Sequence, residues 1–146
     1  MPPANVLAEV SEQDAIRMFS NLPHSIAGIV ANMSFWQSWF IKRCRGESEP
    51  MAASATLGWP TVAPGTWTEV CERFLAGLEE AAAFAGRAEL LERRIDPAIE
   101  FPPLADYTVS DALTHVASHN SHHLGQIIVV RQLRGSWPPP SGSWTW

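Results

Sequence analysis

Two proline-rich stretches constrain the fold of this chain more than any other feature of its sequence. The first covers residues 47–65 (ESEPMAASATLGWPTVAPG), and the second covers residues 95–109 (IDPAIEFPPLADYTV). Proline lacks the backbone N–H that a helix interior requires, so we expect both stretches to interrupt helical structure. Connections of this length are uncommon in compact domains unless they cross the molecule or shape a site. The sequence therefore predicts two long crossovers, the second with a short extended piece.

Helical periodicity dominates the rest of the chain. Apolar residues recur three and four positions apart in four segments, and no alternating pattern typical of strands competes with them. The predicted helices cover residues 6–21, 25–45, 66–94 and 110–134. Four helices with long crossovers indicate an all-α four-helix bundle, which we expect to form one domain over residues 1–146. The tail, residues 136–146, is expected to lie against this bundle through its tryptophans.

The ends of the predicted helices carry residues suited to those positions. Three basic residues crowd the end of the second helix before Gly46, where they complement the helix dipole. Thr66 and Glu69 have the spacing of a capping box for the third helix. Ser110 and Asp111 offer N-cap chemistry for the fourth helix.

Charge and cysteine content limit the classes of function. The formal net charge of −5 gives no electrostatic reason to bind nucleic acid or an anionic membrane. No apolar run approaches the ~20 residues that a membrane span requires, and no secretory leader is visible at the start. Cys44 and Cys71 form no CxxC motif and have no visible activating partner, so we expect reduced, unreactive thiols. Together these features predict a soluble cytoplasmic protein.

Four of the five histidines lie within nine residues: His115, His119, His122 and His123. Positions four apart share one face of a helix, so His119 and His123 can bind one metal ion together. Val116 and Ile127 lie on the same side and predict that this pair faces the interior, although such histidines can also be ordinary core residues. Asn120 occupies the position of the glutamate in the zinc-protease motif HExxH, which excludes that class. Gln126 could orient a metal ligand or a bound water through a hydrogen bond, without binding the metal itself.

The segment HNSHHLGQI resembles the last helix of the DinB/YfiT-like superfamily, whose motif HxxxHxGQ matches His119, His123, Gly125 and Gln126. Three further similarities extend over most of the chain. Residues 23–39 (PHSIAGIVANMSFWQSW) are similar to the second helix of that family. GWP followed by a later tryptophan resembles its middle crossover, and the WPPP tail with a terminal TW recurs in one subgroup.

This resemblance implies an up-down-down-up bundle with a divalent metal, often nickel or zinc, near one end. The metal would be held by one histidine from the second helix and two from the last. Family members include bacillithiol transferases and mycothiol-dependent isomerases, and many form homodimers. The resemblance thus implies a small-molecule or thiol substrate and a homodimeric assembly.

The chain departs from the family pattern at Asn32, where the resemblance places the first histidine of the triad. An amide oxygen is a much weaker ligand for nickel or zinc than imidazole. We therefore expect His119, His123 and Asn32 to form a degraded metal site, which binds its ion weakly or not at all. Gln126, His122 and His115 would surround it, and Trp36, one turn after Asn32, could wall a pocket there.

Three interpretations remain open at this stage. In the first, the weakened site binds a metal that polarises a water or a thiolate for hydrolysis or group transfer. In the second, the chain is a non-enzymatic helical module whose cavity binds a small apolar ligand or a partner chain. In the third, a second copy of the chain completes the site across a dimer.

Overall fold

The structure, a computed structural model, describes residues 1–142 and is built from helices. The α-helices are α1 (Pro3–Leu7), α2 (Glu12–Ile16), α3 (Ile26–Arg45), α4 (Trp67–Ala85), α5 (Ala88–Leu91) and α6 (Val109–Leu133), and the 3-10 helices are η1 (Ala55–Gly58) and η2 (Pro102–Leu104). Across these 142 residues no β-strand forms, and there is only an isolated antiparallel bridge between Arg94 and Thr108, at the two ends of the second crossover. The prediction of an all-α fold is confirmed. No helix in the described part is long and apolar enough to cross a membrane.

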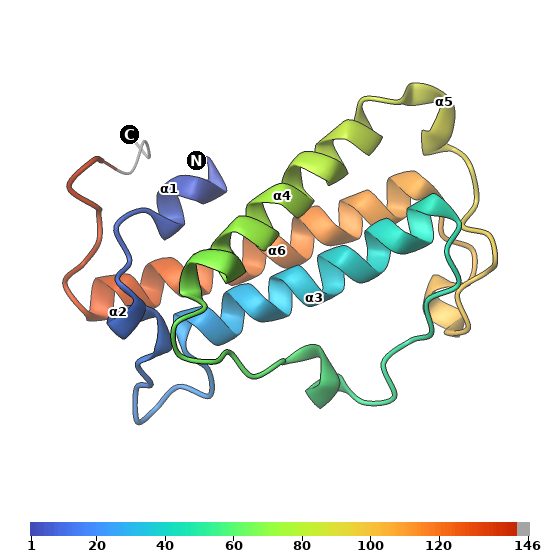
Figure 1. Ribbon diagram of the computed structural model, residues 1–146. Helices are drawn as coiled ribbons and strands as arrows, with labels where there is room; N and C mark the ends of the chain where they lie inside the picture. The colour runs from blue at the N-terminus through green and yellow to red at the C-terminus, as the bar shows by residue number, and fades with distance from the viewer. Residues whose placement is uncertain (143–146) are drawn as a thin grey trace.

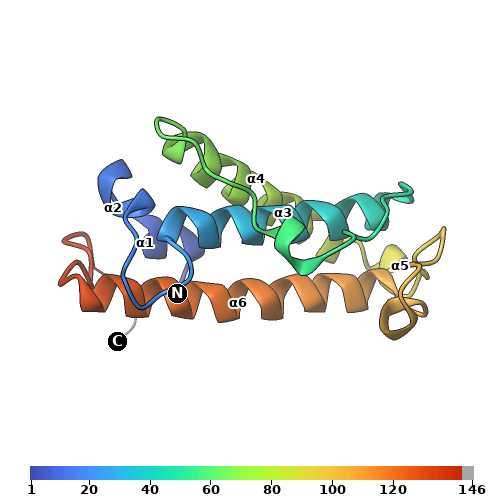
Figure 2. The same cartoon turned by 90° about the horizontal axis from the view of Figure 1, so that it is seen from below.

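Three long helices make the body of the molecule. Helices α3 and α4 run in the same direction, because the first crossover returns the chain to the end at which α3 began, and α6 runs opposite to both (Figure 1). Seen from below, α3 lies between α4 and α6 (Figure 2). Short helices α1 and α2 pack at the end of the molecule where α3 and α4 begin and α6 ends. The central α3 therefore contacts both of the other long helices, and it also contacts α2 and η1.

Local capping explains why α3 and α6 agree closely with their predicted boundaries. The Ser25 hydroxyl accepts a hydrogen bond from the Gly28 amide at the start of α3, and Gly46 ends that helix with a left-handed φ of +86°. At the start of α6, Thr108 and Asp111 form a reciprocal capping box. The hydrogen bonds from Thr108 hold the pKa of the Asp111 carboxyl below its usual value. The cap of α6 is thus Thr108 rather than the predicted Ser110.

The predicted first helix, residues 6–21, is wrong as a continuous element. The chain turns between α1 and α2, where Glu9 adopts a left-handed φ of +58°. Ser11 then caps α2, because its hydroxyl oxygen accepts a hydrogen bond from the Asp14 amide. This local bond offers the backbone an alternative to continuing the helix.

The predicted third helix, residues 66–94, is also too long. Helix α4 ends at Ala85, and Gly86 separates it from the single turn of α5. The expected capping box at Thr66 does not form, because the Thr66 hydroxyl donates to the Ala63 carbonyl instead. The start of α4 is fixed by Trp67, whose indole N–H donates to the Val10 carbonyl over 2.9 Å.

A buried polar chain ties the three long helices together. Gln37 of α3 donates from Nε2 to the Phe74 carbonyl of α4 over 2.9 Å, and its Oε1 accepts from Asn120 Nδ2 of α6 over 2.7 Å. Gln37 and Asn120 are almost fully buried, so their partners are protein atoms. Gly77 provides the space, because a Cβ at that position would overlap with Gln37 Nε2.

One buried guanidinium fastens both ends of the described chain to α6. Arg131 donates to the Val6 carbonyl over 2.8 Å and to the Ser136 carbonyl over 2.9 Å. Its guanidinium carbon also lies 5.3 Å from the centre of the Trp137 ring. The predicted docking of the tail holds for Trp137, which packs on the core. Trp144 and Trp146 lie outside the described residues.

Candidate metal centre

The histidine pair predicted from its spacing lies side by side on α6. The ring centres of His119 and His123 are 4.5 Å apart, with the ring planes at 72°. His123 is buried, with 7% of its surface exposed, and His119 is half-buried. The inward orientation expected from Val116 and Ile127 is thus observed, since both of those residues belong to the core.

Gln126 fixes the orientation of His123. The Nδ1 atom of His123 lies 2.7 Å from Gln126 Oε1, and Gln126 Nε2 lies 3.1 Å from Nε2 of His122. A carbonyl oxygen only accepts, so His123 donates from Nδ1 and keeps the lone pair of Nε2 for a ligand. Gln126 then donates to His122. This is the arrangement in which an outer hydrogen bond sets the tautomer of a metal-binding imidazole.

Burial keeps these imidazoles neutral. It lowers the pKa of His119 to about 4, with the neighbouring His123 adding to the effect, and it also lowers the pKa of His123. Only the unprotonated nitrogen of a neutral imidazole can bind a metal ion. Near neutral pH, both side chains are therefore in the form that ligation requires.

Asn32 is buried on α3, and one end of its side-chain amide is hydrogen-bonded to the first crossover. Its Nδ2 donates to the Gly58 carbonyl over 2.6 Å, whereas its Oδ1 is buried without a hydrogen-bond partner. Trp36 lies against the same glycine, because a Cβ at position 58 would come within 2.6 Å of Trp36 Nε1. Trp36 therefore supports the crossover and does not line the groove beside the histidines.

An open groove with a volume of about 710 Å³ adjoins the buried face of His123. Its lining is mostly apolar and comes from the segment before α3, from α3, from the crossover and from α6: Leu22, Pro23, His24, Ile29, Trp59, His122, His123, Gly125, Gln126, Val129 and Val130. Trp59 stacks on His24 with ring centres 3.5 Å apart and meets His123 edge-on at 5.6 Å. The sequence alone places the GWP motif, which contains Trp59, in the middle crossover, but it does not assign Trp59 to the site.

His115 belongs to a second hollow nearer the start of α6. Its Nδ1 atom lies 3.2 Å from the hydroxyl oxygen of Tyr107, and burial lowers its pKa. The hollow has a volume of about 500 Å³ and shares His119 and His122 with the histidine cluster. The four histidines thus line two adjoining spaces.

The donor set for a metal ion is smaller than a complete triad. Within residues 1–142, no three side chains among His, Cys, Asp and Glu are placed to hold a metal together. The structure offers two imidazoles on α6, and the unpartnered Asn32 Oδ1 is the one further oxygen among the predicted ligands. Imidazole nitrogens and an amide oxygen are donor types that a divalent ion accepts, with water completing the coordination.

The fold and the site together define the class of protein: it is all-helical and carries a pair of histidines on its last long helix. A family model for the DinB superfamily matches residues 4–127, and the chain belongs to this superfamily. The match includes His119, His123 and Gln126. No curated protein and no solved structure matches the chain significantly.

Proposed function

We propose that this DinB-superfamily protein binds a divalent metal ion, nickel or zinc, weakly at His119, His123 and Asn32. The observation that carries the proposal is the buried, unpartnered Oδ1 of Asn32, together with a neutral histidine pair on α6. A buried acceptor without a partner is costly, and a cation is one partner that would compensate it. An ion in this position supplies Lewis-acid activation of a water molecule or a thiol.

The proposed activity is hydrolysis or group transfer on a small molecule or thiol that enters the groove. Gln126 holds His123 in the ligating tautomer, which keeps its Nε2 free. Trp59, braced by the His24 ring, closes one side of the groove against water. Apolar side chains from α3 and α6 line the remainder and would hold the body of the substrate.

Metal content of the protein, purified without a polyhistidine tag, tests this proposal. Elemental mass spectrometry should find nickel or zinc below one equivalent in the wild type and none in His119→Ala. Asn32→His should bring the content close to one equivalent, because imidazole replaces an amide oxygen. Ser118→Ala, an exposed neighbour, is the control and should retain the wild-type content. Equal metal content in the wild type and His119→Ala would overturn the proposal.

A second candidate function is non-catalytic binding of a small apolar ligand in the same groove. The apolar lining from Ile29, Val129 and Val130 favours it, because those side chains offer no reactive group. A wild type that stays free of metal, and binds an apolar probe with an affinity that Val130→Gln reduces, would favour this candidate.

We also propose a homodimer and a cytoplasmic location. The side of α6 that is exposed between Thr114 and Leu133 carries no charged residue and includes exposed Val129 and Leu133, which suits a contact between copies. Two free cysteines suit a reducing compartment. The mass in solution by light scattering tests the first expectation, and a dimer could also contribute groups to the site in trans.

A further inference from the structure

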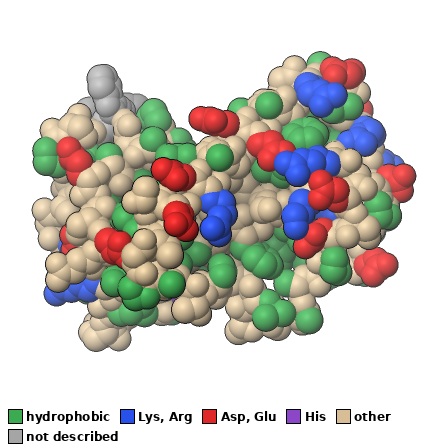
Figure 3. Space-filling view, in the orientation of Figure 1, with side chains coloured by type: hydrophobic (Ala, Val, Ile, Leu, Met, Phe, Trp, Pro, Cys, Tyr) green, Lys and Arg blue, Asp and Glu red, His purple; other side chains and the backbone are tan. Residues whose placement is uncertain are grey.

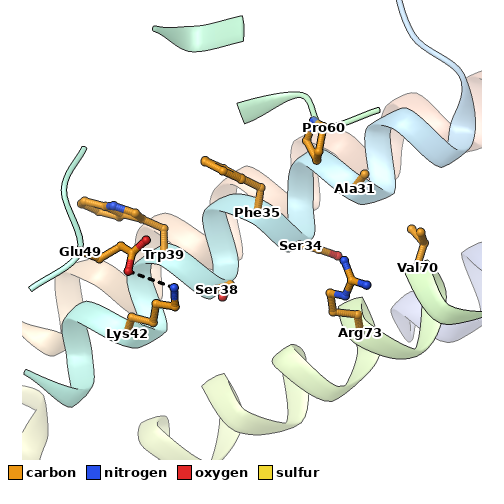
Figure 4. A pocket seen from close by; sticks show the side chains of 10 residues that line it. All are labelled: Ala31, Ser34, Phe35, Ser38, Trp39, Lys42, Glu49, Pro60, Val70 and Arg73. Carbon is orange, nitrogen blue, oxygen red and sulfur yellow. Dashed lines mark hydrogen bonds and ion pairs between the residues drawn. The ribbon is translucent and has the colours of Figure 1, made fainter. Parts of the chain in front are cut away.

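A second cleft opens between α3 and α4 and is separate from the histidine cluster. Its volume is about 280 Å³, and the residues that line it are Ala31, Ser34, Phe35, Ser38, Trp39, Lys42, Glu49, Pro60, Val70 and Arg73 (Figure 4). No histidine among the described residues is visible on the face that Figure 3 shows, where α3 and α4 lie in front. The cleft is therefore distinct from the histidine site, and its lining contains none of the histidines.

The lining of the cleft divides into a polar and an apolar wall. Ser34, Ser38 and Lys42 follow one another at intervals of four residues and so form a row along α3. Beside it runs an apolar row of Ala31, Phe35 and Trp39, also at intervals of four. Trp39 is held in place because its indole N–H donates to the Pro50 carbonyl over 2.9 Å. A ligand in the cleft would meet hydroxyl and cationic groups on one side and aromatic rings on the other.

The deepest polar group of this cleft lacks a partner. Ser34 is 8% exposed, and its hydroxyl is buried with no hydrogen bond. Figure 4 shows the Arg73 side chain extending from α4 toward this hydroxyl. In the described part of the chain, no ion pair includes Arg73. A buried, unpartnered hydroxyl of α3 and an exposed guanidinium of α4 that makes no ion pair within the described residues thus line the same cleft.

Charges at the mouth of the cleft leave this guanidinium as its net positive group. Lys42 Nζ lies 3.0 Å from the Glu49 carboxylate, and both side chains are partly exposed. The charges of Lys42 and Glu49 cancel each other, so Glu49 does not neutralise the charge of Arg73. In the space-filling view acidic and basic side chains are interspersed on the right, and acidic ones predominate on the left, so this face has no large basic field (Figure 3). The cleft is therefore suited to a single anionic group rather than to a polyanion.

We propose that the cleft between α3 and α4 binds a small aromatic carboxylate. The planar guanidinium of Arg73 matches the two oxygens of a carboxylate, and the Ser34 hydroxyl supplies a further donor. The ring of the ligand would lie against Phe35 and Trp39, with Pro60 of the crossover closing the end. The small volume of the cleft limits the ligand to one ring with a short side chain. This site is independent of the metal proposed at the histidines.

Titration of the ¹⁵N-labelled protein with 3-phenylpropionate tests the proposal. We expect saturable shifts of backbone amides in residues 34–42 and 70–73. Arg73→Gln should weaken binding about tenfold through loss of the charge-assisted pair. Ser34→Ala should weaken it about threefold. Arg87→Gln is the matched control, because Arg87 is exposed beyond the end of α4 and pairs with Glu89, and it should not change the affinity.

Any of the following results would overturn the proposal. The first is equal binding of 3-phenylpropionamide, the neutral isostere, because recognition would then not depend on the carboxylate. The second is wild-type affinity in Arg73→Gln, or shifts confined to residues 119–126. The third is loss of probe binding as protein concentration rises, with a dimer seen by light scattering, which would make this face a contact between copies.

Discussion

The side-chain nitrogen of Asn32 donates to the backbone carbonyl of Gly58 over 2.6 Å, which joins the middle of α3 to the first crossover. The hydrogen bond spans 26 residues of sequence and is buried. It explains how an asparagine can occupy the position at which the resemblance to the family predicts a histidine, without leaving both ends of its amide unpartnered. One end stabilises the crossover, and the other, Oδ1, remains available on the buried side.

Asn32→Asp should therefore destabilise the fold strongly. Aspartate has no donor for the Gly58 carbonyl, and its negative charge would be buried, so we expect a loss of about 3 kcal/mol in the free energy of unfolding. Asn21→Asp, in the exposed segment before α3, should change it by less than about 0.5 kcal/mol. Urea unfolding followed by circular dichroism measures both. Similar losses in the two variants would show that the hydrogen bond contributes little.

Two helix-interior glycines should respond in opposite directions to alanine. Gly125→Ala adds a Cβ with no atom within 4 Å and should stabilise α6 by up to about 1 kcal/mol. Gly77→Ala would displace the Gln37 side chain from the Phe74 carbonyl and Asn120, so a net loss of about 1–2 kcal/mol is expected. Thermal and urea unfolding of the pair provides the comparison. A stabilised Gly77→Ala would mean that Gln37 relaxes without losing its partners.

Both thiols should be inert in the folded protein. Burial raises the pKa of Cys44 to about 11 and that of Cys71 to about 12, the latter with help from the Glu72 carboxylate. The reactive thiolate fraction near pH 8 is then lower than in an unfolded chain by about 100-fold or more. Ellman's reagent should label neither cysteine in native protein and both in urea. Rapid native labelling of either residue, identified by peptide mass spectrometry, would contradict this.

Stability of the metal-free protein should fall as the solution becomes acidic. The folded pKa of His119 is about 4, below its ordinary value of 6.5, so the unfolded chain takes up its proton first. The stabilising contribution is complete above about pH 6.5 and is lost as pH falls toward 4. His123 and His115 act in the same direction. Unfolding in the presence of a chelator from about pH 7.5 to about pH 5 should show the loss, and His119→Gln should reduce it.

Features encoded by neighbouring residues could be predicted from the sequence. The caps at Ser25 and Gly46 set the limits of α3, and the spacing of His119 and His123 placed both rings on one face of α6. The break between α1 and α2 was missed, because a helical apolar pattern continues across it. There, the Ser11 cap outweighs that pattern.

Features that depend on partners distant in sequence could not be predicted. The orientation of the Asn32 amide depends on Gly58, and the location of Gln37 depends on Phe74 and Asn120. Likewise, the presence of Ser34 and Arg73 in one cleft requires the packing of α3 against α4. Periodicity indicates which face of a helix is buried, but it does not indicate which polar atoms meet there.

The hydrogen bond from Arg131 to Val6 has a consequence for the order in which the protein folds during synthesis. The two residues are 125 positions apart, so the partner of α1 leaves the ribosome only after more than a hundred further residues have been added. Until then the Val6 carbonyl has no guanidinium to bind, and the apolar face of α1 toward α6 stays uncovered. Closure of α1 onto α6 therefore has to wait until α6 has been synthesised, and a truncation before Arg131 would leave a chain that exposes this surface.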